Sequence, residues 1–419
     1  MAHVKEKYDV IVAGGGTAGV AAATAAARQG SRTLLIERNH CLGGAATMRG
    51  VSTWCGFHAL DAERKQVVFG IVDEVLRAQD ALGGLGPILA HRGVFRPFDS
   101  EVLKVVLDEV VTQAGVDVRF GAMVQSAERD GDNISSITVA THGGLETFLG
   151  CAFVDCSGEG DLAAFGGAST RYGNTDGVNL GSLACRFGGL PNDKLITVDD
   201  VTKAVTEQSF LQGAVTKDRC VTVRLPISGD LVLYLASHDY DPRDSQSLSN
   251  AEIDVRKQSW NYLKAIKSID GCENAYLVST GPEIGTRESR HLNCLHHFTW
   301  TEIEERTSQE NSIALGAWGS EWHDRNSYAS NFEYPPEKTP YEIPMGCLES
   351  IDTSNLFCAG RLADGDRKAG AAIRVMATSM ATGQAAGTAA ALLASARYSA
   401  AELQSVLRAD GVITKATDL

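Results

Sequence analysis

The glycine-rich turn near the start of the chain constrains its fold more than any other feature. Residues 8–19 read YDVIVAGGGTAG, so a short apolar run leads into three spaced glycines, and an alanine-rich segment with helical periodicity follows. In a strand–turn–helix unit, Gly14 permits the tight turn, Gly16 lets the backbone approach a pyrophosphate, and Gly19 permits close packing of helix on strand. The turn therefore predicts a dinucleotide site.

A second strand is predicted over residues 33–36, and it ends at Glu37. An acidic residue about twenty positions after the last glycine typically binds the ribose 2'-hydroxyl of a dinucleotide. The alternative is a glycine-rich turn that binds nothing. Strand, turn, helix and acid together favour the nucleotide site, with the phosphates at the amino terminus of the first helix, near Thr17 and Ala18.

Composition excludes several classes of function. The 419 residues suffice for two or three domains, and 52 acidic residues outnumber 38 lysines and arginines without any basic run. We therefore expect neither nucleic acid nor a membrane as a partner, while a homo-oligomer stays compatible with the sequence. No apolar run is long enough to span a membrane and the first strand starts at Tyr8, so we expect a soluble, cytoplasmic protein.

The ten cysteines show neither C-x-x-C nor metal-like spacing. This pattern predicts reduced, mostly buried thiols and no metal site. A second glycine pair, Gly43 and Gly44, follows Glu37 and Arg38, and Thr47 lies just beyond it. The pair can bring a loop close to a ligand, which suggests an extended cofactor.

The middle of the chain predicts two kinds of structure. Helices are expected over residues 66–80 and again after Asp99, and residues 124–154 alternate apolar and polar positions like an antiparallel meander. Residues 169–340 lack the strand–glycine–helix rhythm, and their polar stretch at 237–250 is predicted to be a long loop. Four of the ten prolines lie between residues 335 and 344, which predicts an extended crossing between domains.

The carboxy-terminal part contains a predicted strand at 355–361 and then a long helix of small residues. Gly383 and Gly387 recur four residues apart among alanines that share this spacing, so one helical face is smooth enough for another backbone to lie against it. The alternative interpretation is a plain buried helix. The smooth face favours a helix in a Rossmann-type layer.

Taken in order, these blocks resemble the FAD-dependent oxidoreductases distantly related to the fumarate reductase and succinate dehydrogenase flavoproteins. The matching blocks are GGGTAG with Glu37, LGGAAT, VDCSGEGDLAA, GTRESRH, YEIP, and NLFCAGR followed by IRVMATSMATGQAAGTAAA. The resemblance implies an α/β fold with a Rossmann-type, glutathione reductase-like FAD-binding domain over residues 1–168 and 341–419. An α+β substrate domain over 169–340 is inserted into it.

FAD is the cofactor that this resemblance implies. Met123 and Val124 correspond to positions that hold the adenine through backbone groups, and a helix amino terminus near residues 371–374 would place positive charge beside the flavin ring. The predicted cofactor contacts are Gly14, Gly16, Thr17, Ala18, Gly19, Glu37, Arg38, Gly43, Gly44, Thr47, Met123, Val124, Gly158, Gly360, Arg361, Arg374 and Gly383.

Departures from these relatives restrict the chemistry. Ala45 and Ala46 stand where relatives that attach FAD covalently have a histidine, so non-covalent binding is expected. No second G-x-G-x-x-G opens another strand–helix unit, which argues against a dedicated NAD(P)H domain but leaves transient binding open. The segment AGRLADGDRKAG differs from the GDAAH type of aromatic hydroxylases, and this weakens a monooxygenase interpretation without excluding it.

Candidate catalytic residues lie in the predicted second domain. In an extended GTRESRHLNCLHH segment, Arg287 and His291 share one face, where they could hold a carboxylate and supply a base. The alternative is that Arg287 and Arg290 form ion pairs with Glu283 and Glu288.

His323 is the other candidate base, with Trp318 and Trp322 as an apolar wall and Asp324 to orient its imidazole. A structural histidine is the alternative.

The sequence thus favours an enzyme that oxidises or desaturates a small polar metabolite by hydride transfer to flavin N5, with an arginine as anchor and a histidine as base. Two other enzyme functions stay open: reduction of an activated double bond, and monooxygenation fed by NAD(P)H. A non-catalytic protein that uses the dinucleotide fold only to bind partners is the third alternative, and the intact glycines count against it.

Overall fold

A computed structural model describes residues 6–175, 177–191 and 193–419. Its largest sheet contains five parallel strands in the order β6–β2–β1–β9–β22. These strands are β1 (Glu6–Ala13), β2 (Thr33–Glu37), β6 (Asp117–Phe120), β9 (Gly144–Asp155) and β22 (Leu356–Cys358). Strand β1 lies in the middle, and its apolar run is buried because layers of structure cover both faces of a parallel sheet.

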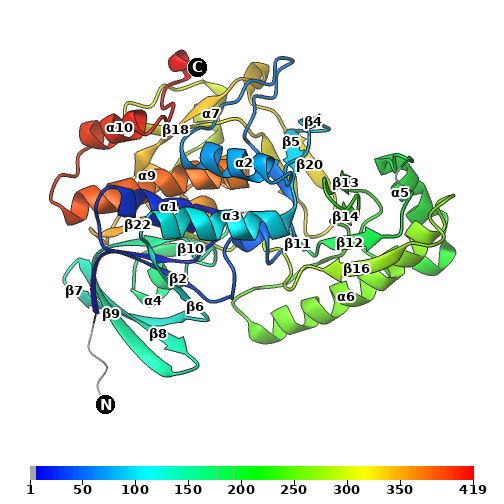
Figure 1. The fold of residues 1–419 in the computed structure, drawn as a ribbon, viewed down its shortest axis with the longest axis horizontal. Coiled ribbons are helices and arrows are strands. Elements are labelled where there is room, and N and C mark those ends of the chain that lie inside the picture. Colours follow the sequence, from blue (N-terminus) through cyan, green and yellow to red (C-terminus); the bar gives the residue numbers. More distant parts are fainter. Residues whose placement is uncertain (1–5, 176, 192) are drawn as a thin grey trace.

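Three helices lie together beside this sheet, as Figure 1 shows: α1 (Thr17–Arg28), α3 (Ser100–Gln113) and α9 (Met376–Ala394). Helices α1 and α9 approach unusually closely. A Cβ atom on Gly383 would lie 2.1 Å from the carbonyl oxygen of Ala18, and one on Gly387 would lie 2.0 Å from that of Ala22. The smooth face predicted for the last long helix therefore packs on the helix of the dinucleotide motif.

The predicted antiparallel meander is confirmed. It consists of β7 (Met123–Asp130), β8 (Asn133–Thr141) and the first part of β9. Beyond the parallel sheet, α2 (Ile71–Ala81) begins five residues later than the helix predicted from residue 66. The reason is Gly70, whose left-handed φ of +93° lies outside the helical region, and a Cβ there would meet Gln384 at 2.4 Å.

A second, smaller core draws its buried members from residues 183–284. It is built on an antiparallel sheet of order β13–β14–β12–β16, which the helices α5 and α6 accompany at the right of Figure 1. Its elements are β12 (Cys185–Gly188), α5 (Val198–Thr206), β13 (Val223–Arg224), β14 (Leu231–Leu233), α6 (Ser245–Lys267) and β16 (Tyr276–Thr280).

The loop predicted over residues 237–250 is wrong in its second half. Helix α6 begins at Ser245, because the Asp244 carboxylate caps it by accepting hydrogen bonds from the amides of Gln246 and Ser247 at 2.9 and 3.4 Å. The first turns of this helix are polar and carry no apolar stripe, which is why the periodicity gave no signal there.

Short strands and helices connect the two cores. The strand pairs are β3 (Thr53–Cys55) and β4 (Leu89–Ala90) on β5 (Val94–Pro97), β10 (Thr170–Tyr172) on β17 (Arg290–Leu292), β11 (Gly181–Ser182) on β15 (Ser237–His238), β18 (Ser312–Gly316) on β21 (Tyr341–Pro344), and β19 (Ser320–His323) on β20 (Ser330–Glu333). The remaining helices are α4 (Asp161–Phe165), α7 (Trp300–Glu304), α8 (Arg367–Ile373) and α10 (Ala400–Ala409). The larger core also includes residues from 292 to 314, so the domain boundaries at 169 and 340 stay a prediction.

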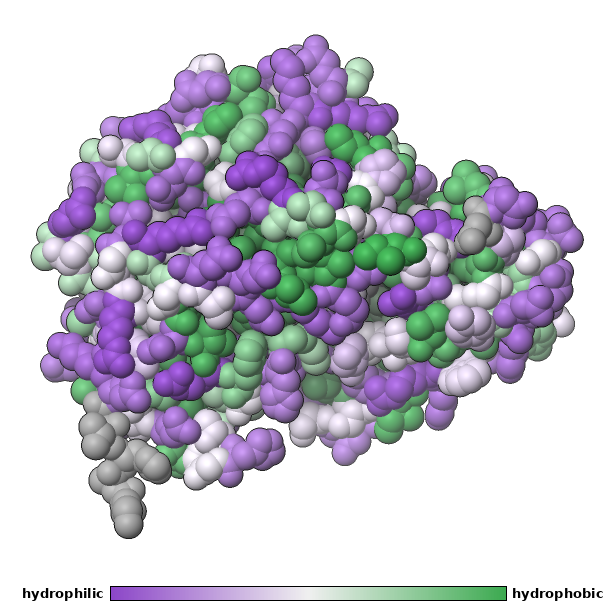
Figure 2. Space-filling view, viewed as in Figure 1, coloured by the Kyte–Doolittle hydropathy of each residue, from purple (hydrophilic) through white to green (hydrophobic). Residues whose placement is uncertain are grey.

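Hydrophilic and hydrophobic residues are interspersed over the face that Figure 2 shows, with one apolar cluster near its middle. Among the described residues, no helix combines the length and the apolar character needed to cross a membrane.

Candidate active site

The carboxyl ends of four parallel strands meet at one edge of the sheet. In the register, Ala13 of β1 pairs with Asp155 of β9, and Asp155 pairs with Cys358 of β22. The turns that follow β1, β2, β9 and β22 all line one cavity, which we call the cofactor cavity. Open α/β sheets bind their ligands at this edge.

The three motif glycines have distinct surroundings. Gly14 has a left-handed φ of +98°, and a Cβ on it would lie 2.4 Å from the carbonyl oxygen of Cys156. A Cβ on Gly19 would lie 1.8 Å from the carbonyl oxygen of Gly14, whereas a Cβ on Gly16 would meet no atom within 4 Å and Gly16 lines the cavity. The bare backbone at Gly16 therefore leaves room for a pyrophosphate beside the amino terminus of α1.

Glu37 ends β2 at the wall of this cavity, where it is buried. One carboxylate oxygen accepts a hydrogen bond from the amide of Gly15 at 2.7 Å, and the other accepts one from the amide of Asn39 at 2.7 Å. These bonds hold the carboxylate in place, and no cation of the described residues forms an ion pair with it. Its neighbour Arg38 also lines the cavity and forms an ion pair with Glu283.

Most of the predicted cofactor contacts line the cofactor cavity. They are Gly14, Gly16, Thr17, Ala18, Glu37, Arg38, Gly44, Met123, Val124, Gly158, Gly360, Arg361 and Arg374. Gly19, Gly43, Thr47 and Gly383 do not line it. Thr47 instead donates a hydrogen bond to the carbonyl of Leu42 at 2.7 Å, so it holds the second glycine loop in shape.

A buried charge cluster lies at one end of the cofactor cavity. Glu159 pairs with Arg361 at 2.5 Å and with Arg49 at 3.1 Å. Burial alone would raise the pKa of Glu159, but Arg361 and Arg49 lower it to about 2. Within the described part of the chain, one terminal nitrogen of Arg361 and the Nε of Arg374 are buried without a hydrogen-bond partner. Such orphaned donors fit a cavity whose ligand supplies acceptors.

A second cavity of about 520 Å³, the substrate cavity, adjoins the first. The two cavities share Ala45, Arg49, Arg361, Arg374 and Met376 in their linings. The amino terminus of α9 lies at this junction, because Val375 and Met376 both face the substrate cavity and no side chain caps the helix. The unpaired amides of this first turn place partial positive charge where the cavities meet, two residues beyond the predicted 371–374.

Arg287 lines the substrate cavity and has no carboxylate within ion-pair distance among the described residues. Its guanidinium donates a hydrogen bond to the carbonyl of Leu180 at 2.6 Å. Burial and the nearby Arg374 lower the pKa of Arg287 to about 10, so it stays charged at neutral pH. The ion pairs of Arg287 with Glu283 or Glu288 that the sequence left open are not formed.

His323 also lines the substrate cavity. Its Nε2 lies 3.4 Å from the carboxylate of Glu321, and its Nδ1 is buried with no partner among the described residues. Burial and Arg287 lower the pKa of His323 to about 3, which keeps the imidazole neutral. The pKa of Glu321 is held well below its usual range despite burial, because His323 and Arg374 stabilise the carboxylate.

The expected surroundings of His323 need two corrections. Trp318 lines the substrate cavity as predicted, but Trp322 does not, and the guanidinium of Arg367 lies 4.1 Å from the centre of its ring. Asp324 does not orient the imidazole, because its carboxylate accepts hydrogen bonds from the amides of residues 326 and 327 in the β19–β20 turn. Glu321 occupies the orienting position, two residues away on the same face of β19.

His291 lies outside the linings of both cavities and is buried. Its Nδ1 lies 3.0 Å from the carbonyl oxygen of Ala363, and its Nε2 lies 2.9 Å from Glu288. With both ring nitrogens engaged, His291 connects β17 to the loop after β22. The structure therefore brings Arg287 and His323 together in one cavity and keeps His291 apart from them.

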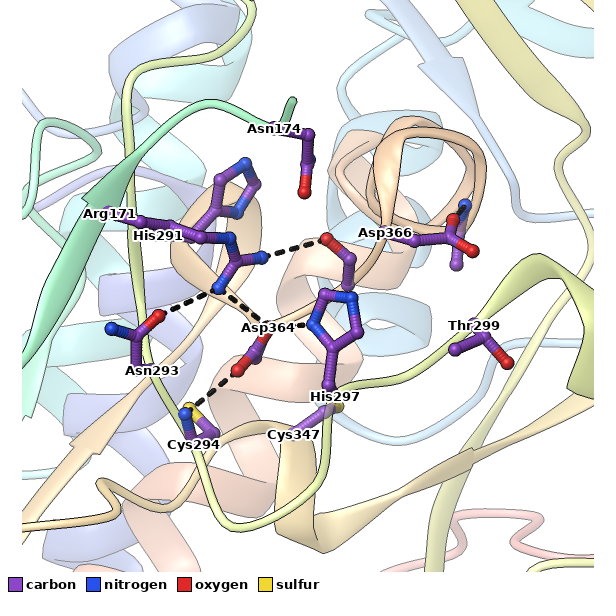
Figure 3. Close-up of polar contacts among 12 residues, drawn as sticks. Arg171, Asn174, His291, Asn293, Cys294, His297, Thr299, Cys347, Asp364 and Asp366 are labelled. Atoms are coloured by element: carbon purple, nitrogen blue, oxygen red, sulfur yellow. Dashed lines mark hydrogen bonds and ion pairs between the residues drawn. The ribbon is translucent and has the colours of Figure 1, made fainter. Parts of the chain in front are cut away.

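A polar cluster around Asp364 fixes the segment that carries the cavity arginines. One oxygen of Asp364 accepts from Arg171 at 2.8 Å and from His297 Nδ1 at 2.6 Å, and the other accepts from the amide of Cys294 at 2.8 Å (Figure 3). These contacts tie strands β10 and β17 to the loop before α8.

The charged residues of the substrate cavity that were not among the sequence candidates are Arg49, Arg92, Lys217, Asp218, Arg219 and Glu321. Lys217 lies in the segment TKDRC, which carries no motif and no periodicity. The sequence did not indicate that Lys217 is buried, because a lysine is ordinarily exposed and only the packing of distant segments buries this one.

A family model described as FAD dependent oxidoreductase matches residues 9–410. The chain belongs to this family. It is therefore an enzyme that uses FAD, as the sequence resemblance implied, and the Rossmann-type fold is confirmed. The further kinship with fumarate reductase stays a resemblance.

Several solved structures are similar to this chain at low identity. BexE, reported in a study of oxidation during BE-7585A biosynthesis, is 15% identical with a TM-score of 0.51, over 96% of this chain and 65% of BexE. A geranylgeranyl bacteriochlorophyll reductase-like protein from Thermoplasma acidophilum is 13% identical with a TM-score of 0.48, over 97% of this chain and 83% of that one. The p-nitrophenol 4-monooxygenase PnpA from Pseudomonas putida is 14% identical with a TM-score of 0.43, over 99% and 83%.

Proposed function

We propose that this enzyme oxidises or desaturates a small polar metabolite by hydride transfer to flavin N5, with the metabolite bound in the substrate cavity. The proposal rests on one observation, namely that the cofactor cavity and the substrate cavity adjoin each other. One ends at the dinucleotide loop, and the other is lined by several cations, of which Arg287 and Lys217 have no carboxylate partner among the described residues. Five residues line both cavities. That arrangement suits a redox cofactor whose reactive end meets a charged substrate.

The residues of the cofactor cavity suit FAD. In our proposal, Gly16 and the amino terminus of α1 receive the pyrophosphate, Glu37 receives the ribose hydroxyl, and the backbone of Met123 and Val124 faces the adenine. The amino terminus of α9 at the junction would favour negative charge on a reduced ring. When bound, FAD supplies a two-electron acceptor, and Ala45 supports non-covalent attachment.

Two side chains of the substrate cavity suit a polar substrate. Arg287 is charged at neutral pH and lacks a carboxylate partner in the described structure, so it would bind an anionic group of the substrate, such as a carboxylate. The Nδ1 of neutral His323 would accept a hydrogen bond from a substrate hydroxyl or amine, since Glu321 lies beside Nε2. Trp318 supplies the apolar wall.

The test is an anaerobic visible spectrum of the FAD-loaded protein, recorded first with NADH or NADPH and then with a panel of hydroxy acids, amino acids and saturated acids. We expect a yellow spectrum that stays oxidised with NAD(P)H and bleaches with one class of acid. Bleaching by NAD(P)H alone would contradict the proposal and favour a reductase or monooxygenase. A protein that binds FAD and is reduced by neither would contradict the proposed class of substrate.

The role of Arg287 has a matched control. The variant Arg287→Met should bind FAD normally but lose reduction by the active acid at low acid concentration, because the anchor for its anionic group is gone. Arg408→Met, in exposed helix α10, should behave as wild type. Equal reduction by all three proteins would exclude Arg287 as the anchor.

A further inference from the structure

Lys217 is a buried amine at the wall of the substrate cavity that the proposed function does not use. Lys217 lies in the segment between the short helix at Ser209–Leu211 and strand β13, and 8% of its surface is exposed. The buried Tyr262 holds its backbone, because the tyrosine hydroxyl accepts from the amide of Lys217 at 3.1 Å and donates to its carbonyl at 2.8 Å. The main chain there is fixed at the wall of the cavity.

The amine of Lys217 has no hydrogen-bond or ion-pair partner among residues 6–175, 177–191 and 193–419. A buried ammonium without a carboxylate is costly, and this cost favours the neutral amine. Burial and the neighbouring Arg287 lower the pKa of Lys217 to about 7, against smaller opposing effects of Cys220 and Glu321. Near neutral pH, the side chain is therefore divided between amine and ammonium.

Among the other titratable groups of this cavity, His323, Glu321, Cys55 and Cys220 are poorer proton acceptors near neutral pH. His91, Asp218, Tyr234 and Tyr328 also line it, and burial lowers the pKa of His91 and raises the pKa of both tyrosines. Burial and Arg287 hold the pKa of His323 at about 3, and the carboxylate of Glu321 is also held well below its usual range. Burial raises the pKa of Cys55 and of Cys220 to about 12, so both thiols keep their protons at neutral pH. A general base works best when its pKa lies near the working pH, and Lys217 meets this condition.

We propose that the amine of Lys217 accepts the proton that the substrate releases when it is oxidised, while Arg287 holds the anionic group of the substrate. This inference rests on the proposed function. Oxidation of an H–C–X–H group moves the C–H electron pair with its hydrogen to the flavin, and the X–H electron pair closes the C=X double bond. The remaining proton goes to the amine of Lys217, which becomes an ammonium and later releases it to water.

The first test measures the titration of Lys217 without a substrate. The FAD-loaded enzyme is labelled with trace acetic anhydride between pH 5 and 10, and acetylation of each lysine is quantified by mass spectrometry relative to its own alkaline plateau. We expect a midpoint near pH 7 for Lys217, about three units below that of a lysine-containing reference peptide labelled in the same tube. A midpoint for Lys217 that coincides with that of the reference peptide would overturn the proposal.

The second test uses Lys217→Met, Lys217→Arg and the control Lys257→Met with the acid that reduces the wild-type flavin. For Lys217→Met we expect flavin reduction to slow about 10²- to 10⁴-fold with little change in the acid's Kd. Lys217→Arg should be equally slow, because a guanidinium does not give up its proton in this pH range. A wild-type rate of flavin reduction in Lys217→Arg would show that Lys217 only binds the anion. So would a Lys217→Met variant in which only the Kd of the acid rises.

The pH dependence of kcat/KM distinguishes a base from a residue that has only a structural role. Wild-type kcat/KM should fall about tenfold per pH unit below about 7, since the ammonium cannot accept a proton, and this limb should be absent in Lys217→Met. Bound FAD and circular dichroism check the fold of each variant. If no acid in the panel reduces the flavin, the proposed function fails, whereas the labelling midpoint still decides the protonation of Lys217.

Discussion

Substitution of Gly383 by alanine should separate the helix of the dinucleotide motif from the last long helix. The new Cβ would lie 2.1 Å from the carbonyl oxygen of Ala18. Non-bonded heavy atoms of this kind prefer about 3.5 Å, so α9 and α1 must part by about 1 Å along a fully buried contact. Ala18 lies in the first turn of α1 and lines the cofactor cavity, so the displacement reaches the proposed pyrophosphate site directly.

Two opposing effects set the size of the change in stability. Alanine is a better helix former than glycine by about 1 kcal/mol in a helix interior. Overpacking a well-packed core costs about 1 to 3 kcal/mol, and the upper end applies here because the obstructing atom belongs to the backbone of α1 and cannot rotate away. We expect the free energy of unfolding to fall by about 2 kcal/mol, together with weaker FAD binding.

The assay is urea unfolding of the FAD-free and FAD-loaded protein, followed by circular dichroism, together with titration of FAD by flavin fluorescence. Gly143→Ala is the control, because a Cβ on Gly143 in the exposed turn between β8 and β9 would meet only the hydroxyl of Thr141 at 3.5 Å. A Gly383→Ala protein as stable as wild type, with unchanged FAD affinity, would refute the close helix contact as a requirement of the cofactor site.

Three further predictions concern the acidic residues Glu37, Glu159 and Asp364. Glu37→Gln should weaken FAD binding by about 10- to 100-fold, because a charged hydrogen bond to the ribose contributes about 1.5 to 3 kcal/mol, and calorimetric titration with equal affinities would contradict this. The pKa of Glu159 is lowered from its ordinary value of 4.5 to about 2. Its carboxylate therefore stabilises the folded state above pH 4.5, and this stabilisation is lost as the pH falls toward 2. In Glu159→Gln, the free energy of unfolding measured with urea should therefore depend less on pH in this acidic range. The same pH dependence in both proteins would exclude the Glu159 cluster as its source. Asp364→Ala should lower the free energy of unfolding by about 2 kcal/mol, because Arg171 loses its carboxylate partner. A decrease smaller than that of the exposed control Asp80→Ala would contradict this prediction.

Local sequence was sufficient wherever one segment carried its own signal. The strand, glycine turn and helix at residues 8–28 obey short-range rules, and α3 begins directly after Asp99 as predicted, with Asp99 as its cap. The same local rules failed at α6, whose polar first turns carry no stripe, and at residues 66–70, where the left-handed Gly70 delays α2.

The side chains of the substrate cavity show the limit of such rules. Asp324 adjoins His323 in sequence, and the adjacent position in a strand turns a side chain to the opposite face, so Glu321 faces the imidazole instead. Lys217 and Arg287 lie seventy residues apart, and no periodicity relates them. Their common cavity arises only when the second core docks on the first.

The sequence by itself determined the Rossmann-type fold and the position of the dinucleotide loop, since spaced glycines and a following acid have few other structural uses. The use of FAD was implied by the family resemblance of its motifs. The sequence also determined that the last long helix has a face of small residues. Tertiary structure alone decided that this face lies on α1, that His291 is enclosed in a hydrogen-bond network, and that Lys217 is buried beside Arg287. The physical reason is that burial and charge–charge contacts depend on which distant segments meet, and these contacts set the protonation of each group in the cavity.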